Sequence, residues 1–434
     1  MRKLNIWALL LLCFAAVSCF RDADFEAGFS GEDSGSRSFP ERSQSASDRR
    51  VMIMVSAGFN SLSGYLSSDL EELESGYLPE GNYYNSDVLL VLKRLPVKSG
   101  DFLSPSAPLL YRLYKDRSGN VVRDTLRSWS GSTQLCTAET LTDALTWIRN
   151  KFSAKSYGMV FSSHASGWLP SGYYADPDRF ESAKSGFVSR RGVREVFPPI
   201  DPYPAVKSLG QDKTPSGGVE LELQEFADAI PFHLDYLLVD ACLSGCVEVA
   251  HVLKGKADIV GFSPTEVLAN GFNYLDIVSR LLEGDPDPVG VCQEYFAYYD
   301  AQSGDSRSAT ITAVDTRKMD ALENVCRELF DKYRLAISSL DGSRVQGYFR
   351  FGRHFFYDLK DVLVKAGISA EEEARLDAAL DAFIVYKAAT PYFLSIPITH
   401  YSGLSMYLPS MGSDYLDNFY KSAVSWNDAT LLVK

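Results

Sequence analysis

Cys242 and His164 are the side chains of this sequence whose types and settings best fit nucleophilic catalysis. Cys242 follows an apolar run, Leu-Asp-Tyr-Leu-Leu-Val-Asp at 234–240, and a glycine comes soon after it. A run that stops in this way is typical of a buried parallel strand leaving its sheet, which is the edge where ligands bind in open α/β sheets. A thiol at that edge can attack a carbonyl carbon if a base shares its proton.

His164 is the histidine best placed to be that base. It follows a second predicted strand, 157–163, and small residues come after it. A lone histidine at a strand end is more often structural than catalytic, but two such strand ends in one sheet favour a catalytic pair. The other histidines lie before the Cys242 strand, in the helix after it, or among aromatic residues near the C-terminus: His233, His251, His354 and His400.

Other chemistries fit the sequence less well. Cys242 and Cys246 are four residues apart, which is not the spacing of a zinc knuckle, and no His-Glu-x-x-His occurs, so we expect no metal site. Phosphate-binding, dinucleotide-binding and nucleophile-elbow motifs are also missing. A disulfide between Cys242 and Cys246 stays open as an alternative, although a bridge across one helical turn is geometrically awkward.

Three further residues are candidates for the walls of a substrate site. Asp240 either accepts hydrogen bonds at the turn after its strand or lies at the floor of a pocket for a lysine or arginine side chain. Glu266, in the loop after the next strand, is either a second wall or a solvated surface residue. We expect Trp168 to pack at the rim of the pocket.

The elements that must position these residues alternate between apolar strands and amphipathic helices, which predicts an α/β fold with a mostly parallel central sheet. We find no internal repeat. The expected strands are 51–55, 87–92, 157–163, 234–240, 258–262 and 309–315, with a hairpin at 109–114 and 121–125 and extended chain at 395–408. The expected helices are 62–73, 137–152, 219–230, 247–253, 274–282, 289–301, 319–338, 355–365 and 370–390.

The N-terminus has the pattern of a lipoprotein signal peptide. Arg2 and Lys3 precede an apolar stretch, and Ala-Val-Ser-Cys ends it at Cys19, as in the bacterial lipobox. We therefore expect residues 1–19 to be removed up to a lipid-bearing Cys19, with a plain signal peptide as the alternative. The stretch is too short for a typical transmembrane anchor. Residues 20–48 are rich in serine, glycine and charge and are predicted to be a flexible tether.

Composition bounds the class of protein and its partners. The chain has 434 residues, of which 46% are hydrophobic and 12% aromatic, so it is globular. Without Arg2 and Lys3 it carries 41 basic and 56 acidic residues, 41 − 56 = −15, which disfavours nucleic acid as a partner. Five cysteines follow Cys19, and an odd number leaves at least one thiol outside any set of intramolecular disulfides.

The motifs together resemble those of the clostripain-like cysteine peptidases. Ser-His-Ala-Ser-Gly-Trp at 163–168 is similar to the family's His-Gly-Ser-Gly-Trp, and Asp-Ala-Cys-Leu-Ser-Gly at 240–245 is similar to its Asp-Ala-Cys-Leu-Met-Gly. The likeness continues through 247–250 and 261–274 and involves most of 50–315. It implies a caspase-like α/β/α fold and a peptidase that cuts after a basic residue.

The resemblance also implies roles for individual residues. His164 and Cys242 would form the catalytic dyad, the backbone N–H groups of Ala165 and Cys242 would bind the oxyanion, and acidic residues would hold the basic side chain. Asp240 matches the family's pocket aspartate directly, whereas Glu266 and Asn270 match less directly. Two departures stand out: Ala165 replaces a glycine, and Ser244 replaces a methionine. If that glycine needs a positive φ, alanine costs about 1 kcal/mol or more there.

Processing and cofactors are implied by the resemblance alone. Some family members cut themselves in the loop after the histidine, and here residues 169–218 form a long insertion whose candidate cleavage sites are Lys184, Arg190, Arg191 and Arg194. Some relatives are helped by calcium, but no dense acidic loop here argues for it, so we expect no cofactor.

The predicted organisation is a peptidase domain at 49–315 followed by a mainly helical region at 316–434 that completes the fold. We expect an exported, lipid-anchored monomer that acts on polypeptides in the bacterial cell envelope. The alternative is a catalytically silent surface lipoprotein of the same fold that binds a polypeptide or glycan.

Overall fold

The computed structural model describes residues 48–58, 62–81, 87–99, 102–104, 106–173, 177, 180, 212–214, 217–349 and 354–434. These residues belong to one compact unit, Ala46–Lys434. The predicted lipidation site, Cys19, lies outside them. So do the candidate self-cleavage sites, which are Lys184, Arg190, Arg191 and Arg194.

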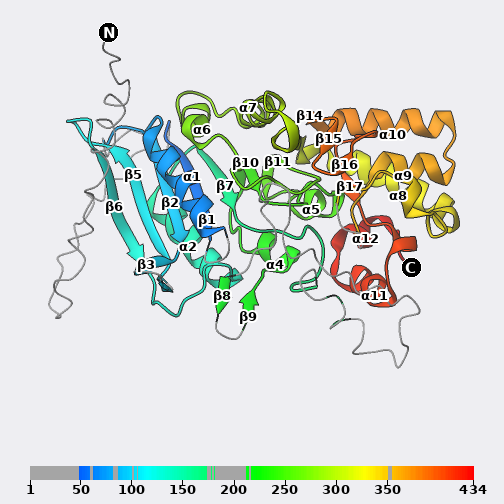
Figure 1. The fold of residues 1–434 in the computed structure, drawn as a ribbon, viewed down its shortest axis with the longest axis horizontal. Helices are drawn as coiled ribbons and strands as arrows, with labels where there is room; N and C mark the ends of the chain where they lie inside the picture. Colours follow the sequence, from blue (N-terminus) through cyan, green and yellow to red (C-terminus); the bar gives the residue numbers. More distant parts are fainter. Residues whose placement is uncertain are drawn as a thin grey trace, which may run out of the picture. The chain divides into compact units, whose positions relative to one another are not determined.

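A nine-stranded sheet forms the centre of the part of the chain that the structure describes, in the order β14-β12-β11-β10-β7-β1-β2-β5-β6 (Figure 1). The five strands from β11 to β2 in this order run parallel, and the two at each edge are antiparallel. The strands are β1 (Arg50–Ala57), β2 (Val88–Arg94), β5 (Leu109–Lys115), β6 (Val121–Ser128), β7 (Ser156–Ser162), β10 (Leu234–Asp240), β11 (Ala257–Phe262), β12 (Thr310–Asp315) and β14 (Ile384–Ala389).

Helices cover both faces of the sheet (Figure 1). One face carries α1 (Ser63–Ser75), α6 (Tyr274–Leu282) and α7 (Pro288–Asp300). The other carries α2 (Ala138–Lys151), α4 (Leu223–Asp228) and α5 (Val247–Val252). Because both faces are covered, the parallel strands are buried on both sides, which explains why they read as continuous apolar runs and not as alternating patterns.

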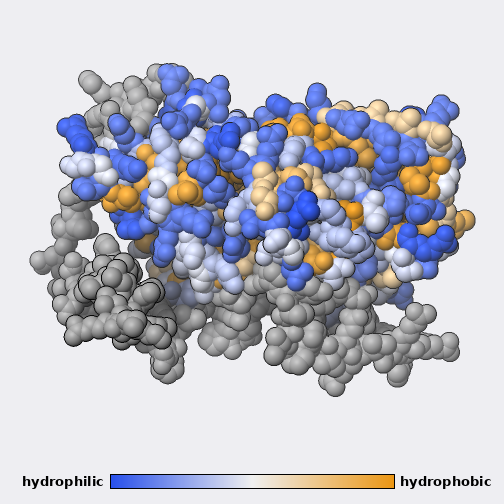
Figure 2. Space-filling model, turned by 45° about the horizontal axis from the view of Figure 1, so that its top comes forward, coloured by the Kyte–Doolittle hydropathy of each residue, from blue (hydrophilic) through white to orange (hydrophobic). Residues whose placement is uncertain are grey.

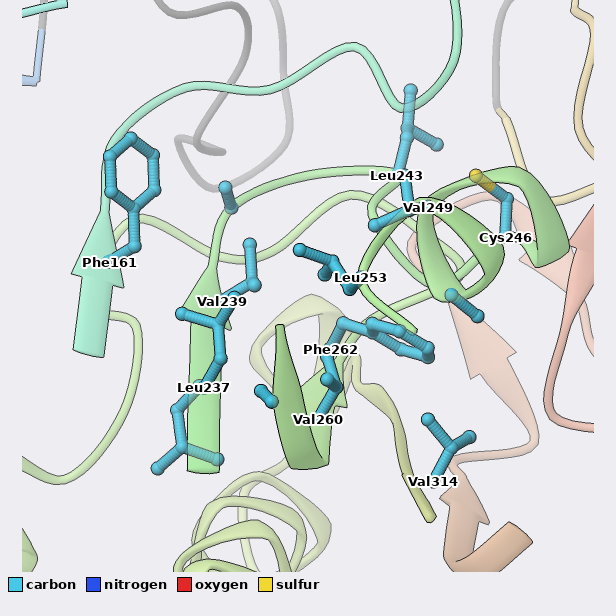
Figure 3. Packing of buried hydrophobic residues seen from close by; sticks show 14 of the residues in the cluster. Phe161, Leu237, Val239, Leu243, Cys246, Val249, Leu253, Val260, Phe262 and Val314 are labelled. Atoms are coloured by element: carbon cyan, nitrogen blue, oxygen red, sulfur yellow. The ribbon is translucent and has the colours of Figure 1, made fainter. Parts of the chain in front are cut away.

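The core around β10 is built from strand residues that face α5. Figure 3 shows Leu237 and Val239 of β10 beside Val260 and Phe262 of β11, with Leu253 close to them. Each of these side chains is buried. Truncating such a residue to alanine typically costs about 2–5 kcal/mol, so the packing of these side chains stabilises the end of β10 that precedes Cys242.

The C-terminal region adds helices and short strand pairs. Its helices are α8 (Met319–Ile337), α9 (Leu359–Ala366), α10 (Ala370–Phe383), α11 (Asp414–Ala423) and α12 (Ser425–Thr430). The short pairs of the described chain are β3 (Val97–Ser99) with β4 (Phe102–Ser104), β8 (Asp212–Thr214) with β9 (Gly217–Val219), β13 (Tyr357–Asp358) with β17 (Ser405–Met406), and β15 (Tyr392–Phe393) with β16 (Ile396–Pro397).

Most predicted elements are confirmed within a few residues, but three helices differ. The helix predicted at 370–390 is wrong in its second half, because α10 ends at Phe383 and 384–389 form β14, an edge strand paired with β12. The helix predicted at 219–230 shortens to α4, since Val219 belongs to β9. The helix predicted at 355–365 begins only at Leu359, after β13.

In the described ranges, no helix is both long and apolar enough to span a bilayer. On the face drawn in Figure 2, hydrophobic residues lie in small groups between hydrophilic ones.

Candidate active site

Strand register places Cys242 and His164 side by side. β10 and β7 are parallel neighbours, and Asp240 at the end of β10 pairs with Ser162 at the end of β7. Cys242 and His164 each lie two residues beyond this last pair. The structure therefore brings the predicted nucleophile and base together at the carboxyl edge of the sheet, where ligands bind in open α/β sheets.

The loop that carries Cys242 is clamped to the loop after β11. The Sγ atom accepts a hydrogen bond from the N–H of Val267 at 3.2 Å, and the N–H of Leu243 donates to the carbonyl of Thr265 at 2.8 Å. Leu243 has φ 58°, in the left-handed region that costs a non-glycine residue about 1 kcal/mol or more. This strained, tightly bonded turn fixes the position of the sulfur, which is buried with its residue 1% exposed.

The loop that carries His164 is tied to β1 and touches the cysteine loop. Ser163 Oγ donates to the carbonyl of Ala57 at 3.0 Å. Gly167 has φ +60°, and a Cβ atom there would approach the Leu243 carbonyl oxygen to 2.6 Å. Only glycine fits this close approach of the two loops.

Ala165 is not strained. The described non-glycine residues with positive φ are Leu243, Leu394 and Leu431, and Ala165 is not among them. The alanine that replaces the family's glycine therefore meets no left-handed backbone in this structure, and its N–H remains a usable donor.

Asp240 lies on the face of the sheet that α6 and α7 cover. Its Oδ2 atom accepts hydrogen bonds from Ser162 Oγ at 3.2 Å and from the hydroxyl of Tyr274 at 2.6 Å, and the residue is 1% exposed. Burial raises the pKa of Tyr274 well above its usual value, and the negative charge of Asp240 raises it further. Tyr274 is therefore a neutral donor to the Asp240 carboxylate.

Two tyrosines of α7, which the sequence analysis did not select, lie near Asp240. Tyr295 packs on Phe272 with ring centroids 5.2 Å apart and on Tyr299 at 4.9 Å. Burial raises the pKa of both tyrosines well above the usual value, and the charge of Asp240 adds to the effect. Their spacing of four residues marks one helix face, but only the docking of α7 shows that this face looks toward Asp240.

The other predicted pocket residues have mixed settings. Glu266 is 1% exposed, so the reading of it as a solvated surface residue is wrong. Asn270 is exposed at the end of the same loop. Trp168 is fully buried against Tyr407 and Tyr420, with ring centroids 4.6 and 5.1 Å away, so its contacts are those of a packing residue.

A pocket lies beside His164, on the other face of the sheet from Asp240. The empty space in and around this pocket, including space open to solvent, is about 690 Å³. Most of its walls are apolar side chains from the ends of β7 and β10, from α4 and from α5. The residues around it are Cys136, Phe161, Ser163, His164, Ala165, Ser166, Gly167, Glu220, Leu221, Leu223, Phe226, Val239, Ser244 and Val249.

None of the five cysteines after Cys19 forms a disulfide, so the alternative bridge between Cys242 and Cys246 is wrong. Burial raises the pKa of the thiols of Cys246 and Cys326 well above the usual value, and that of Cys292 to about 12. These three thiols are therefore poor nucleophiles. Among the described residues, no group of histidine, cysteine and acidic side chains is arranged to hold a metal ion.

The C-terminal region holds both loops through Glu248. One carboxylate oxygen of this fully buried residue accepts the N–H of Tyr407 at 2.9 Å and the hydroxyl of Tyr420 at 2.7 Å. The same two tyrosines pack on Trp168, four residues after His164. The N–H of Ser405 also donates to the carbonyl of Gly245 at 3.0 Å. Residues of the C-terminal region thus contact both α5, which follows Cys242, and the loop that follows His164.

Comparison with known proteins agrees with this geometry. Residues 54–178 and 200–424 match the model of the clostripain family. The chain belongs to the clostripain family. It is therefore a cysteine peptidase, and the predicted family, enzyme class and caspase-like α/β fold are confirmed.

Solved structures support the assignment. This clostripain-family peptidase is similar to an inactive zymogen of a C11 protease from Parabacteroides distasonis, with 28% identity, a TM-score of 0.68, and coverage of 88% of this chain and 97% of that one. It shares its fold with a secreted C11 cysteine protease from Bacteroides thetaiotaomicron, solved with an irreversible peptide inhibitor, at 22% identity and a TM-score of 0.67, covering 88% and 99%. No curated protein matches the chain.

Proposed function

We propose that this peptidase is an exported endopeptidase that cuts polypeptides after arginine or lysine through Cys242 and His164. The observation that carries the proposal is the register of β7 and β10, which sets both residues two positions beyond the paired ends Ser162 and Asp240. The same register puts a buried carboxylate next to the nucleophile. A thiol, an imidazole and a buried carboxylate at one edge suit acyl transfer from a basic residue.

In the proposed reaction His164 takes the proton of the Cys242 thiol, and the thiolate attacks the carbonyl carbon of the scissile peptide bond. The backbone N–H groups of Cys242 and Ala165 donate to the oxyanion of the tetrahedral intermediate. His164 then gives its proton to the leaving amine as the C–N bond breaks, which leaves a thioester on Cys242. A water molecule, deprotonated by His164, hydrolyses the thioester, and the thiol is restored.

Selectivity for basic residues would come from Asp240, with Glu266 and Asn270 as further candidates from the resemblance. Two neutral hydroxyls donate to Asp240, from Ser162 and Tyr274, and they leave its negative charge in place. A substrate cation that reaches this buried carboxylate would form a charge-assisted hydrogen bond, which is stronger than a hydrogen bond between neutral groups. The tyrosine rings beside it can pack on the apolar stem of lysine or the guanidinium of arginine.

Fluorogenic peptides that end in arginine or lysine test the catalytic assignment. The wild-type protein and a Cys326→Ala control, which loses a distant buried thiol, should release the fluorophore, and Cys242→Ala should not. Removal of a covalent nucleophile typically costs several orders of magnitude in rate. Equal cleavage by wild type and Cys242→Ala, or none by wild type, would overturn the proposal and favour a silent binding protein.

Processing is proposed to occur in the insertion, after Lys184, Arg190, Arg191 or Arg194. The similar Parabacteroides protein is described as an inactive zymogen, which supports a maturation step in this family. N-terminal sequencing of fragments from the wild-type protein should identify one of these four positions, and Cys242→Ala should stay intact. Fragments that also arise from Cys242→Ala would contradict self-cleavage.

Export and anchoring are proposed through the N-terminal segment. The similar Bacteroides protein is described as secreted, which supports export. Incorporation of a labelled fatty acid should depend on Cys19 and vanish in Cys19→Ser. We also propose that the peptidase works as a monomer without a cofactor. Calcium chelation should therefore leave peptide cleavage unchanged, and sedimentation should give the mass of one chain.

A further inference from the structure

The apolar pocket beside His164 has walls that suit a hydrophobic side chain. Phe161, Val239 and Val249 form its buried part, and Leu223 and Phe226 of α4 are half-buried at its side. The rings of Phe161 and Phe226 pack with centroids 4.9 Å apart. Figure 3 shows Phe161 at the end of β7, Val239 near the end of β10, and Val249 on α5. Filling this space with apolar atoms would remove apolar surface from water.

The apolar pocket and Asp240 lie on opposite faces of the sheet. Val239 directly precedes Asp240 on β10, and Phe161 directly precedes Ser162, which donates to Asp240. Successive side chains of a strand point to opposite faces, so the pair Phe161 and Val239 faces α4 and α5 while Asp240 faces α6. The catalytic residues lie at the edge between the two sites.

An extended substrate that crosses this edge also alternates its side chains. If the basic residue before the scissile bond reaches Asp240, each of its neighbours points toward the apolar pocket. The position of His164 shows which of the two neighbouring residues lies closer to the pocket, because His164 lines the pocket and must protonate the leaving amine. The leaving amine belongs to the residue after the scissile bond, so that residue lies nearest to the pocket.

We propose that the apolar pocket is the subsite for the residue that follows the cut, and that it takes a large apolar side chain such as leucine or phenylalanine. This inference rests on the proposed function, since it uses the roles of His164 and Asp240. Glu220 lines the pocket and adds a negative charge to the apolar walls, so an acidic residue at this substrate position should be the poorest. The preferred cleavage sequence is then a basic residue followed by an apolar one.

Internally quenched peptides with a fixed arginine test the subsite. The two peptides of the first pair have leucine or glycine directly after the arginine and are otherwise identical. The two peptides of the second pair have leucine or glycine directly before the arginine. Leu223→Lys places a charge at the pocket wall, and Gln224→Lys places the same charge on the exposed neighbouring position of α4. Mass spectrometry confirms the bond that is cut, and kcat/KM is measured for each peptide.

In the wild-type protein and in Gln224→Lys, leucine after the arginine should raise kcat/KM about tenfold or more over glycine, as expected for an apolar side chain entering a fitted pocket. In Leu223→Lys this ratio should fall toward one, and the pair that differs before the arginine should keep its ratio. Each ratio compares two peptides on the same protein, so partial loss of folded protein does not affect it.

The possible results separate the two proposals. Cleavage after arginine with no effect of the following residue would overturn the subsite alone. A leucine preference before the arginine that Leu223→Lys abolishes would show that the pocket takes the preceding residue, which also overturns the proposal. Failure to cleave any of the peptides would instead contradict the proposed function.

Discussion

Asp240 has one role that the structure shows and a second role that we propose. It accepts hydrogen bonds from Ser162 and Tyr274, as a residue at a strand end often does. In the proposed function it also presents a carboxylate to the basic side chain of the substrate. Burial keeps the Tyr274 hydroxyl protonated by raising its pKa, so the carboxylate is held by neutral donors. These hydrogen bonds orient the acid, and we propose that its charge also attracts the basic side chain of the substrate.

Asp240→Asn should reduce kcat/KM for arginyl and lysyl peptides by about a hundredfold or more, because it removes the charge that pairs with a buried cation. Asp235→Asn is a matched control, since Asp235 lies on the same strand and accepts the N–H of Tyr157 at 3.1 Å. Alkylation of Cys242 by a small neutral reagent should continue in Asp240→Asn. An unchanged preference for basic residues would refute the pocket role.

The sequence was sufficient for the residues that follow strand ends but not for those on helix faces. Cys242, His164 and Asp240 could be selected because their types and their places after apolar runs are visible in the chain. Tyr295 and Tyr299 could not, because tyrosines at helical spacing are common core residues. Their link to Asp240 depends on how α7 docks on β10 and β11, which is a tertiary property.

At the scale of elements, the error at 370–390 has a clear cause. The apolar pattern of α10 continues past Phe383 without a glycine or proline, so helical periodicity alone gave no reason to stop. Ile384, Val385 and Tyr386 are β-branched or aromatic and favour a strand. Pairing with β12 at the edge of the sheet decides the outcome, and the side chains of β14 alternate in exposure as an edge strand's do.

Glu248 joins α5 to the C-terminal elements, and Tyr420→Phe tests that joint. The tyrosine hydroxyl donates to the carboxylate at 2.7 Å, and hydrogen bonds to charged groups contribute about 1.5–3 kcal/mol. Chemical denaturation at neutral pH should show a loss of this order, whereas Tyr298→Phe, on the surface of α7, should show almost none.

The loss should depend on pH. Burial raises the pKa of Glu248, so the folded state keeps this proton at a higher pH than the unfolded state. This difference in pKa stabilises the folded state at pH values below the pKa of Glu248 in the unfolded chain. The stabilisation is lost as the pH rises through the pKa of Glu248 in the folded state. Because the Tyr420 hydroxyl favours the charged form, its removal should cost more as pH rises. A cost that shrinks with rising pH would contradict the assigned hydrogen bond.

For the whole molecule, the described chain is one compact unit, so hydrogen bonds between C-terminal helices should affect the unfolding of the entire domain. Glu372 of α10 forms such hydrogen bonds with α8. Its carboxylate accepts hydrogen bonds from Lys332 and Tyr333 of α8, each at 2.6 Å, and from the N–H of Ser369 at 2.9 Å. The bond with Lys332, followed by that with Tyr333, lowers the pKa of Glu372 from 4.5 to about 2.

A carboxyl group whose pKa is lowered by folding stabilises the folded state at pH values above its pKa in the unfolded chain. This stabilisation is lost as the pH falls through the pKa of the folded state. Glu372→Gln should therefore lower the urea midpoint at pH 7, and its difference from wild type should shrink between pH 4.5 and about 2. Glu371→Gln, at the exposed neighbouring position, should change the midpoint far less. A difference between Glu372→Gln and wild type that stays constant across this range would show that packing, not the charged bond, holds α10 to α8. A second unfolding transition in either protein would show that the C-terminal helices unfold independently of the sheet. The C-terminal residues that contact the loops of Cys242 and His164 could then unfold while those loops stay folded.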